Sequence, residues 1–132
     1  MFEVNFLAVA LAALSAFLLG GLWYSPLLFA NRWMALTGQS AERLKSGSMA
    51  MIFGGAFLLN LIAAFVLAAF LGPDPGVEFA SAAGFAVGLC WVTASLGVNY
   101  LFERRPLGLW LINGSYFTLQ FTAMGAILGA MG

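Results

Sequence analysis

The chain has 132 residues, of which 63% are hydrophobic and only 8% are charged, and its five basic and five acidic residues give a net charge of zero. This small number of polar residues cannot cover the surface of a water-soluble domain. The composition therefore indicates a single integral membrane domain over residues 1–132. No basic stripe is present, which argues against a nucleic-acid partner. With one cysteine and no histidine, we expect no metal and no cofactor.

Four long apolar runs lie at about residues 4–22, 48–71, 79–102 and 107–131. Each is close to the roughly 20 residues that a helix needs to cross the hydrocarbon of a bilayer. We therefore predict an all-α fold, an integral membrane four-helix bundle. The first run follows Glu3 rather than a basic segment, which argues against a cleaved secretory signal.

Two of the connections have sequences that end or begin helices. Gly-Pro-Asp-Pro-Gly at residues 72–76 is expected to end the second helix in a tight turn, because proline removes backbone donors and glycine accepts positive φ. Pro106 is expected at the first position of the last helix, a few residues after the third helix ends. The third and fourth helices are therefore predicted to be antiparallel neighbours.

The long connection between the first and second runs contains a shorter helical pattern. Apolar residues that include Trp33 recur there at helical spacing. Ser25 is expected to cap a helix over residues 26–37 that begins with Pro26 and stops at Gly38. Its tryptophan suits the boundary between acyl chains and headgroups, so we predict a short interfacial helix.

All five basic residues occupy only two of the connections. Arg32, Arg43 and Lys45 lie between the first and second runs, and Arg104 and Arg105 lie between the third and fourth. A chain that crosses a membrane four times places these two connections on the same side. Because basic loops stay on the cytoplasmic side, we predict that both termini lie outside.

Small residues recur about every four positions along the predicted helices. The third run has Gly84, Gly88, Ser95 and Asn99, and the fourth has a second G-x-x-x-G pattern near its end. Small residues let helix backbones approach closely in lipid. The pattern is weak in a glycine-rich chain, so packing within the monomer and a homo-oligomer both stay open.

Polar residues that interrupt the runs are the candidates for ligand binding or for bonds between helices. An amide in hydrocarbon costs free energy unless it finds a partner. Asn60 and Gln120 fall near the middle of their helices, where they could bond to each other or to a ligand. The full set of candidates is Asn60, Ser95, Asn99, Asn113, Tyr116 and Gln120.

The sequence offers little support for catalysis. No carboxylate or lysine lies deep inside a run, which disfavours a proton-coupled carrier. The serines lack a histidine base, and Cys90 has no neighbouring cation to activate it as a nucleophile. We therefore expect no catalytic residue, and we expect that the protein is not an enzyme. An inner-surface motif is instead expected to anchor and orient the protein: Trp23, Tyr24, Ser25, Pro26, Trp33, Glu103, Arg104 and Arg105.

Two segments together resemble a known family. They are Trp-Tyr-Ser-Pro-Leu-Leu-Phe at residues 23–29 with Trp33, and Phe-Glu-Arg-Arg-Pro at residues 102–106 with residues 109–113 and Tyr116. This combination resembles the small bacterial membrane proteins grouped as domain of unknown function 1761, over nearly the whole chain. The resemblance implies four spans in the bacterial inner (cytoplasmic) membrane and no assigned reaction. Some members have glycine at the position of Ala30 and histidine at that of Phe117, so chemistry that rests on an imidazole is in doubt here.

The leading functional prediction is a small non-enzymatic bundle that binds a membrane lipid or a small amphipathic molecule, or that assembles with itself or a partner through its small-residue faces. The alternative is a carrier or channel-like protein for a neutral or amphipathic small molecule. A carrier needs a cavity or hydrated path lined by the amide side chains, whereas an assembly module can be filled solid.

Overall fold

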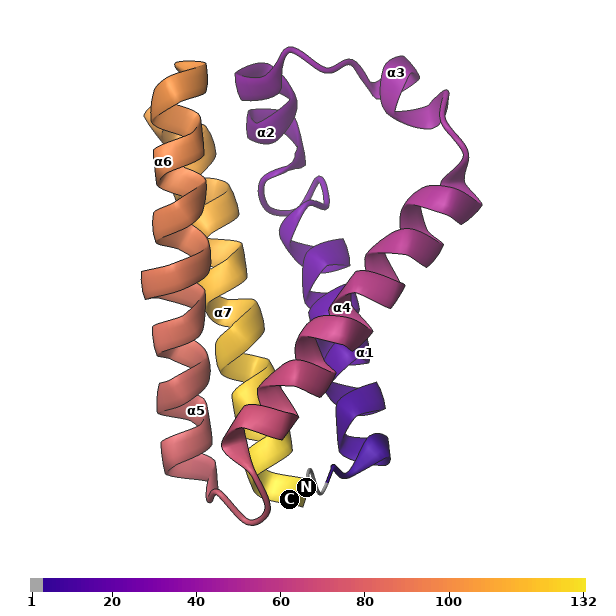
Figure 1. The fold of residues 1–132 in the computed structure, drawn as a ribbon. Coiled ribbons are helices and arrows are strands. Elements are labelled where there is room, and N and C mark those ends of the chain that lie inside the picture. The colour runs from indigo at the N-terminus through magenta and orange to yellow at the C-terminus, as the bar shows by residue number, and fades with distance from the viewer. Residues whose placement is uncertain (1–3) are drawn as a thin grey trace.

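The structure, a computed structural model, describes residues 4–132, which form helices and no strand (Figure 1). The helices α5, η1 and α6 follow one another without a break and form one rod, in which η1 is a π-helix. The elements in chain order are α1 (Phe6–Trp23), α2 (Ala30–Thr37), α3 (Ala41–Lys45), α4 (Met49–Leu71), α5 (Val77–Ala86), η1 (Val87–Thr93), α6 (Ala94–Glu103) and α7 (Leu107–Met131).

Three helical segments are long and apolar enough to cross a membrane, namely Phe6–Trp23, Met49–Leu71 and Val77–Glu103. They coincide closely with the first three predicted spans. Large apolar side chains also cover the outside of the molecule, and those of Phe70 and Phe102 are each 86% exposed. An apolar exterior suits lipid and not water, which supports the prediction of a membrane protein.

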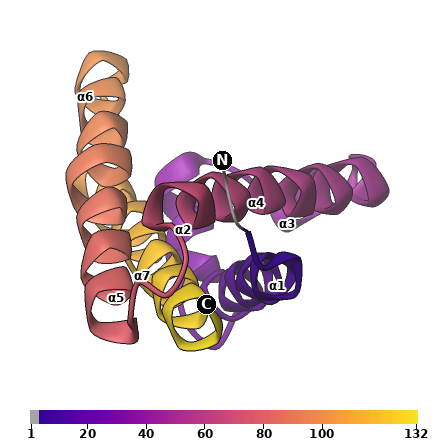
Figure 2. The ribbon, with the colours of Figure 1, turned by 60° about the horizontal axis from the view of Figure 1, so that its bottom comes forward.

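The connection between α4 and α5 is the tight turn that the sequence predicts. Gly72, Asp74 and Gly76 have φ of 74°, 48° and 83°. The amide of Asp74 donates to the carbonyl oxygen of Gly132 at 3.2 Å, so this turn lies against the end of the chain. The start of α1 lies beside the end of α7 (Figure 2), and Nδ2 of Asn5 donates to the carbonyl oxygen of Met131 at 3.1 Å.

The turn between α6 and α7 makes these two helices antiparallel neighbours, as predicted (Figure 1). Arg104 ends α6 in the left-handed region, with φ of 58°. The predicted place of Pro106 is wrong by one residue: it precedes the helix, and α7 begins at Leu107.

The expected helix over residues 26–37 is shorter than predicted, because α2 begins only at Ala30. Ser25 does not cap it, since its hydroxyl donates at 2.7 Å to the carbonyl oxygen of Leu22, at the end of α1. The amide of Ala30 in turn donates to the carbonyl oxygen of Ser25 at 3.1 Å. Residues 25–28 therefore form a turn that closes on α1. The predicted stop at Gly38 is confirmed by its φ of 77°.

The core lies where α1, α4 and α7 meet, and it consists mostly of alanine on the side of α1. Such small side chains let the helix axes come close together, as packing in lipid favours. Met124 of α7 is the largest side chain that is completely buried. The buried cluster comprises Ala8, Val9, Ala12, Ala13, Ala16, Ala64, Leu67, Ala68, Met124 and Leu128.

Glycines bring the α5–η1 part of the rod into backbone contact with α7. A Cβ on Gly88 would lie 2.8 Å from the carbonyl oxygen of Phe117, and one on Gly84 would overlap that of Phe121. In the opposite direction, a Cβ on Gly125 would overlap the carbonyl oxygen of Ala80. Both G-x-x-x-G patterns are therefore used for packing within the monomer.

The small-residue stripe of the third predicted span does not continue to Ser95 and Asn99, and both side chains are exposed. The π-helix η1 causes the shift, because each π-type bond spans five residues rather than four. After Gly88, the residues facing α7 are Thr93 and then Gly97, at a step of five followed by one of four. The prediction, which assumed a regular α-helix throughout, placed the wrong residues on this face.

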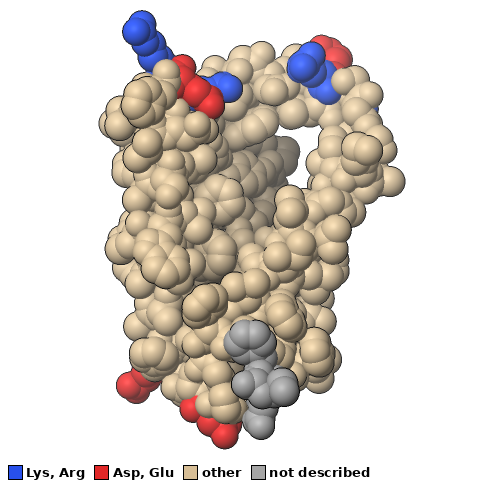
Figure 3. Space-filling model, in the orientation of Figure 1, with Lys and Arg blue, Asp and Glu red and all other residues tan. Residues whose placement is uncertain are grey.

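The expected regular four-helix bundle is not confirmed, because α4 diverges from the other long helices toward its N-terminus (Figure 1). It packs mainly on α1, where Phe17 lies 5.9 Å from the ring centroids of both Phe53 and Phe57. Gly54 and Gly55 have open space where a side chain would project. The divergence leaves an opening between α4 and the α2–α3 segment, visible in Figure 3.

The two ends of the molecule differ in charge. The elements that carry Arg32, Arg43 and Lys45 lie at the same end as the turn that carries Arg104 and Arg105 (Figure 1). On the face in Figure 3, basic side chains gather at this end and only acidic ones appear at the other. We call the first end, with its five basic residues and the carboxylates of Glu42 and Glu103, the cationic end.

Candidate functional site

Two of the predicted polar residues form an amide pair between α4 and α7. Nε2 of Gln120 donates to Oδ1 of Asn60 at 2.9 Å. Gln120 is only 4% exposed, so its amide is withdrawn from lipid and satisfied by the partner helix. This geometry favours the role of a bond between helices over that of a ligand site.

A second polar group, the tyrosine–asparagine cluster, consists of Tyr24, Tyr100 and Asn113. The hydroxyl of Tyr24 donates to Oδ1 of Asn113 at 2.6 Å, and Nδ2 of Asn113 donates to the hydroxyl oxygen of Tyr100 at 2.7 Å. Asn113 on α7 thus joins the end of α1 to α6. Burial raises the pKa of the Tyr24 phenol, and the nearby phenols of Tyr116 and Tyr100 add to the shift, so Tyr24 keeps the proton that it donates.

Tyr116 lies beside this cluster and ties α7 to the middle of α1. Its hydroxyl donates to the carbonyl oxygen of Ala16 at 2.8 Å, and its ring packs edge-on against that of Tyr24 with 5.4 Å between centroids. Gly20 makes room for it, because a Cβ there would lie 3.0 Å from the tyrosine hydroxyl oxygen.

Thr93, which the sequence analysis did not single out, joins η1 to α7. Its hydroxyl donates to the carbonyl oxygen of Gly114 at 2.9 Å and lies 3.2 Å from that of Thr118. Its own carbonyl oxygen accepts the indole N–H of Trp110 at 2.9 Å. A residue five positions after Gly88 faces α7 only if the helix contains a π-helical step, so a regular α-helical pattern did not indicate Thr93 as a contact with α7.

Ser95 and Asn99 do not join the other candidates. Asn99 donates at 3.0 Å to the carboxylate of Glu103, one helical turn away. The same carboxylate accepts the Nε–H of Arg105 at 3.1 Å, with both side chains about half exposed. These residues therefore form a small charged network on the outer surface of the cationic end.

The inner-surface motif is assembled partly by contacts within the protein. The indole N–H of Trp23 donates to the carbonyl oxygen of Ile112 at 3.0 Å, and the ring of Trp33 packs edge-on against Tyr24 at 6.2 Å. Pro26 is exposed in the turn that follows α1. The tryptophans thus hold helices together as well as lying near the cationic end.

Within residues 4–132, every buried side-chain nitrogen and oxygen has a hydrogen-bond partner. The polar interior is therefore occupied by the protein's own contacts. Hollows lie instead at the surface. One of about 280 Å³ is lined by Val4 and Gly132 among others, and two of about 340 and 370 Å³ lie between the α6–η1 rod and α7.

Neither a curated protein nor a solved structure matches this chain. A family model does match, over residues 7–129, and its description is "Protein of unknown function (DUF1761)". This match confirms the resemblance seen in the aromatic and Glu-Arg-Arg-Pro segments. With nearly its whole length covered, the chain belongs to the DUF1761 family of proteins of unknown function.

Proposed function

We propose that the chain crosses the bacterial inner membrane four times, with α7 as the fourth span and both termini outside. At 25 residues, α7 is about 37 Å long, enough for a hydrocarbon layer of roughly 30 Å. Its polar side chains are compatible with a span because most of them face other helices. The cationic end would then face the cytoplasm, as the distribution of basic loops favours.

In this membrane the protein acts as a non-enzymatic module that binds lipid and assembles through its helix faces. The observation that carries this proposal is the bond between Gln120 and Asn60, at 2.9 Å. A binding site at mid-depth would need these amides to face a ligand, but the side-chain NH₂ of Gln120 donates to Oδ1 of Asn60 instead. Amphipathic molecules can therefore bind only in the apolar hollows on the outer surface, which membrane lipid surrounds.

Native mass spectrometry of the purified protein tests lipid binding. We expect lipid adducts to survive a delipidating detergent, and we expect added phospholipid to raise the melting temperature, because a ligand of the native state stabilises it. A protein that carries no lipid and whose melting temperature does not respond to added phospholipid would contradict the proposal.

Self-assembly, where it occurs, would use α4. The glycine pairs of α5–η1 and α7 already pack against each other within the monomer, whereas a Cβ on Gly54 or Gly55 would meet nothing within 4 Å. Gly54→Leu would then change the oligomeric state measured by light scattering in detergent. An unchanged state, for a protein that is oligomeric to begin with, would exclude this face.

The opening beside α4 favours a carrier as the second candidate (Figure 3). A carrier predicts that water reaches Asn60 from this opening, whereas a solid module predicts a dry position. The test is Asn60→Cys in a Cys90→Ala background, probed with a water-soluble maleimide in intact membranes. Labelling would favour the carrier, and protection until detergent is added would favour the module.

A further inference from the structure

The two hollows between the α6–η1 rod and α7 lie end to end, because Trp110 lines both. We call them together the outer crease. It extends from Leu107 to Leu119 on α7, a length of about 18 Å. One leaflet of hydrocarbon is about 15 Å deep, so the outer crease spans a single leaflet. Its walls include Thr93, Gly97 and Leu101 on the rod and Leu107, Trp110 and Gly114 on α7.

The walls of the outer crease are fixed and apolar. The indole N–H of Trp110 is held by the carbonyl oxygen of Thr93 at 2.9 Å, which sets the orientation of the ring between the two hollows. Val98 and Leu101 are 56% and 80% exposed, so the outer rim is apolar as well. Such a surface suits a flexible hydrocarbon chain and offers little to a polar solute.

The mouth of the outer crease is positively charged. Arg105 lines it, and its partner Glu103 is about as exposed as Arg105 itself. An exposed ion pair of this kind is weak, so the guanidinium can also bind a phosphate. Arg104 precedes Arg105 in the chain. Among the basic residues of the described part of the chain, only Arg105 forms an ion pair.

We propose that the outer crease binds one anionic phospholipid of the leaflet at the cationic end, with an acyl chain along Trp110 and the headgroup phosphate at Arg104 and Arg105. This inference rests on the proposed lipid-binding function and names its ligand. Charge complementarity selects the occupant, because the five basic residues of the cationic end outnumber its two carboxylates.

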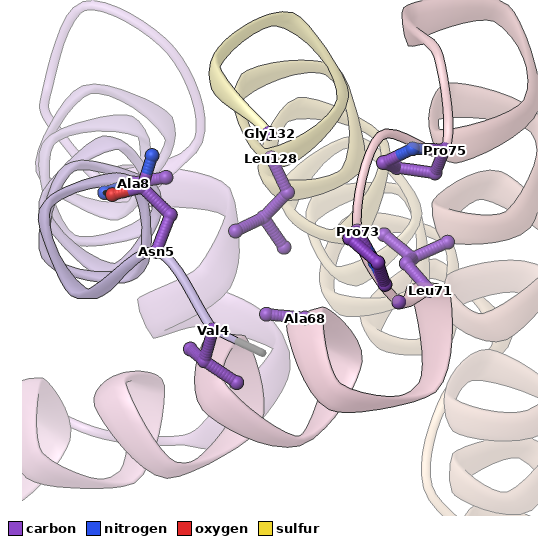
Figure 4. A pocket seen from close by; sticks show the side chains of 10 residues that line it. Val4, Asn5, Ala8, Ala68, Leu71, Pro73, Pro75, Leu128 and Gly132 are labelled. Carbon is purple, nitrogen blue, oxygen red and sulfur yellow. Dashed lines mark hydrogen bonds between the residues drawn. The ribbon is translucent and has the colours of Figure 1, made fainter. Parts of the chain in front are cut away.

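The hollow at the other end provides a comparison (Figure 4). It has about 280 Å³ and is lined by uncharged side chains that include Val4, Ala68 and Leu128. The neighbouring turn contributes Asp74, which disfavours an anionic headgroup. Of these three hollows in residues 4–132, those of the outer crease combine an apolar channel with a basic side chain at its mouth.

The test uses the full chain in detergent with equal amounts of phosphatidylglycerol and phosphatidylcholine, and native mass spectrometry measures the lipid retained. We expect the wild type to prefer phosphatidylglycerol. Arg104→Gln with Arg105→Gln should reduce that preference, by about fivefold for each charge removed. Arg43→Gln with Lys45→Gln on α3 is the matched control, since it removes the same charge away from the outer crease and should leave the preference intact.

A second pair of variants tests the apolar channel. Ala94 lines the outer crease and Ser95, its exposed neighbour, does not. Ala94→Leu should fill the channel and reduce retention of both lipids severalfold, whereas Ser95→Leu should not. Circular dichroism and the melting temperature establish that each variant is folded.

The outcomes separate the two proposals. Equal loss of preference in both charge variants would mean a general surface potential, and unchanged retention in Ala94→Leu would mean a different site; either result overturns the assignment to the outer crease while lipid binding stands. A wild type that retains neither lipid would overturn lipid binding itself and the assignment with it.

Discussion

The side-chain amide of Gln120 on α7 donates a 2.9 Å hydrogen bond to Oδ1 of Asn60 on α4, and this bond links the divergent helix α4 to α7. In lipid such a bond contributes about 0.6 to 1.7 kcal/mol to stability. We expect Asn60→Leu and Gln120→Leu to be coupled by this amount in a double-mutant cycle, measured by unfolding in mixed detergent.

The control for this cycle is Asn99→Leu, because Asn99 is exposed and bonds only within its own helix. It should change stability little. If both leucine variants together leave the melting temperature and oligomeric state unchanged, the amide pair does not hold these helices together.

Tyr24 should make stability depend on alkaline pH. Burial raises the pKa of its phenol in the folded state. The stabilisation is therefore fully present below the unfolded pKa of about 10 and declines as the pH rises from there toward the folded pKa, by at most about 1.4 kcal/mol per pH unit. Tyr24→Phe should make this decline shallower and should cost about 1 kcal/mol at neutral pH through the lost bond to Asn113. An identical pH profile for the variant would contradict this assignment.

The glycines of the rod and of α4 should respond oppositely to alanine. Gly88→Ala forces a Cβ to within 2.8 Å of the backbone at Phe117 and Thr118, and this should cost about 1–3 kcal/mol. Gly54→Ala meets nothing within 4 Å, so it should stabilise α4 by up to about 1 kcal/mol through helix propensity. Unfolding free energies of the two variants check this, and equal costs would mean that the α5–η1 contact with α7 is not as close as described.

The topology can be tested with single cysteines in a Cys90→Ala background. Asp74→Cys lies in the turn at the acidic end and Gln39→Cys in the connection between α2 and α3 at the cationic end. In intact cells a membrane-impermeant maleimide should label the first, and the second only after permeabilisation. The reverse pattern would place the cationic end outside.

Much of the fold could be read from the sequence because its signals are local. The apolar runs, the Gly-Pro-Asp-Pro-Gly turn and the stop at Gly38 follow from hydropathy and backbone preferences, and they agree with the helix ends closely. The pairing of Asn60 with Gln120 was one of two alternatives that the sequence left open. The start of α2 was missed, because Ser25 bonds backward to α1 instead of forward to the next helix.

The residues of the rod that face α7 could not be predicted, because the helical periodicity decides which side chains point toward α7. One extra residue in a turn moves every later side chain to a different face. One π-helical step after Gly88 turns Thr93 and Gly97 inward and leaves Ser95 and Asn99 outside. Close contact between Gly88 and the Phe117 carbonyl is compatible with that step, and no local sequence preference reveals it. This single change in helical periodicity thus put Thr93 and Gly97 on the face that the prediction had given to Ser95 and Asn99.

The sequence by itself determined that this is an apolar helical chain of the DUF1761 family, with its basic residues in two connections, because composition and hydropathy act residue by residue. The order of the spans also predicted that these two connections share one side of the membrane. Only the tertiary structure decided that α4 diverges from the other long helices and that Trp110 and Arg105 border one crease. Those relationships depend on contacts between helices distant in the chain, where the geometry of packing rather than local preference selects the partner.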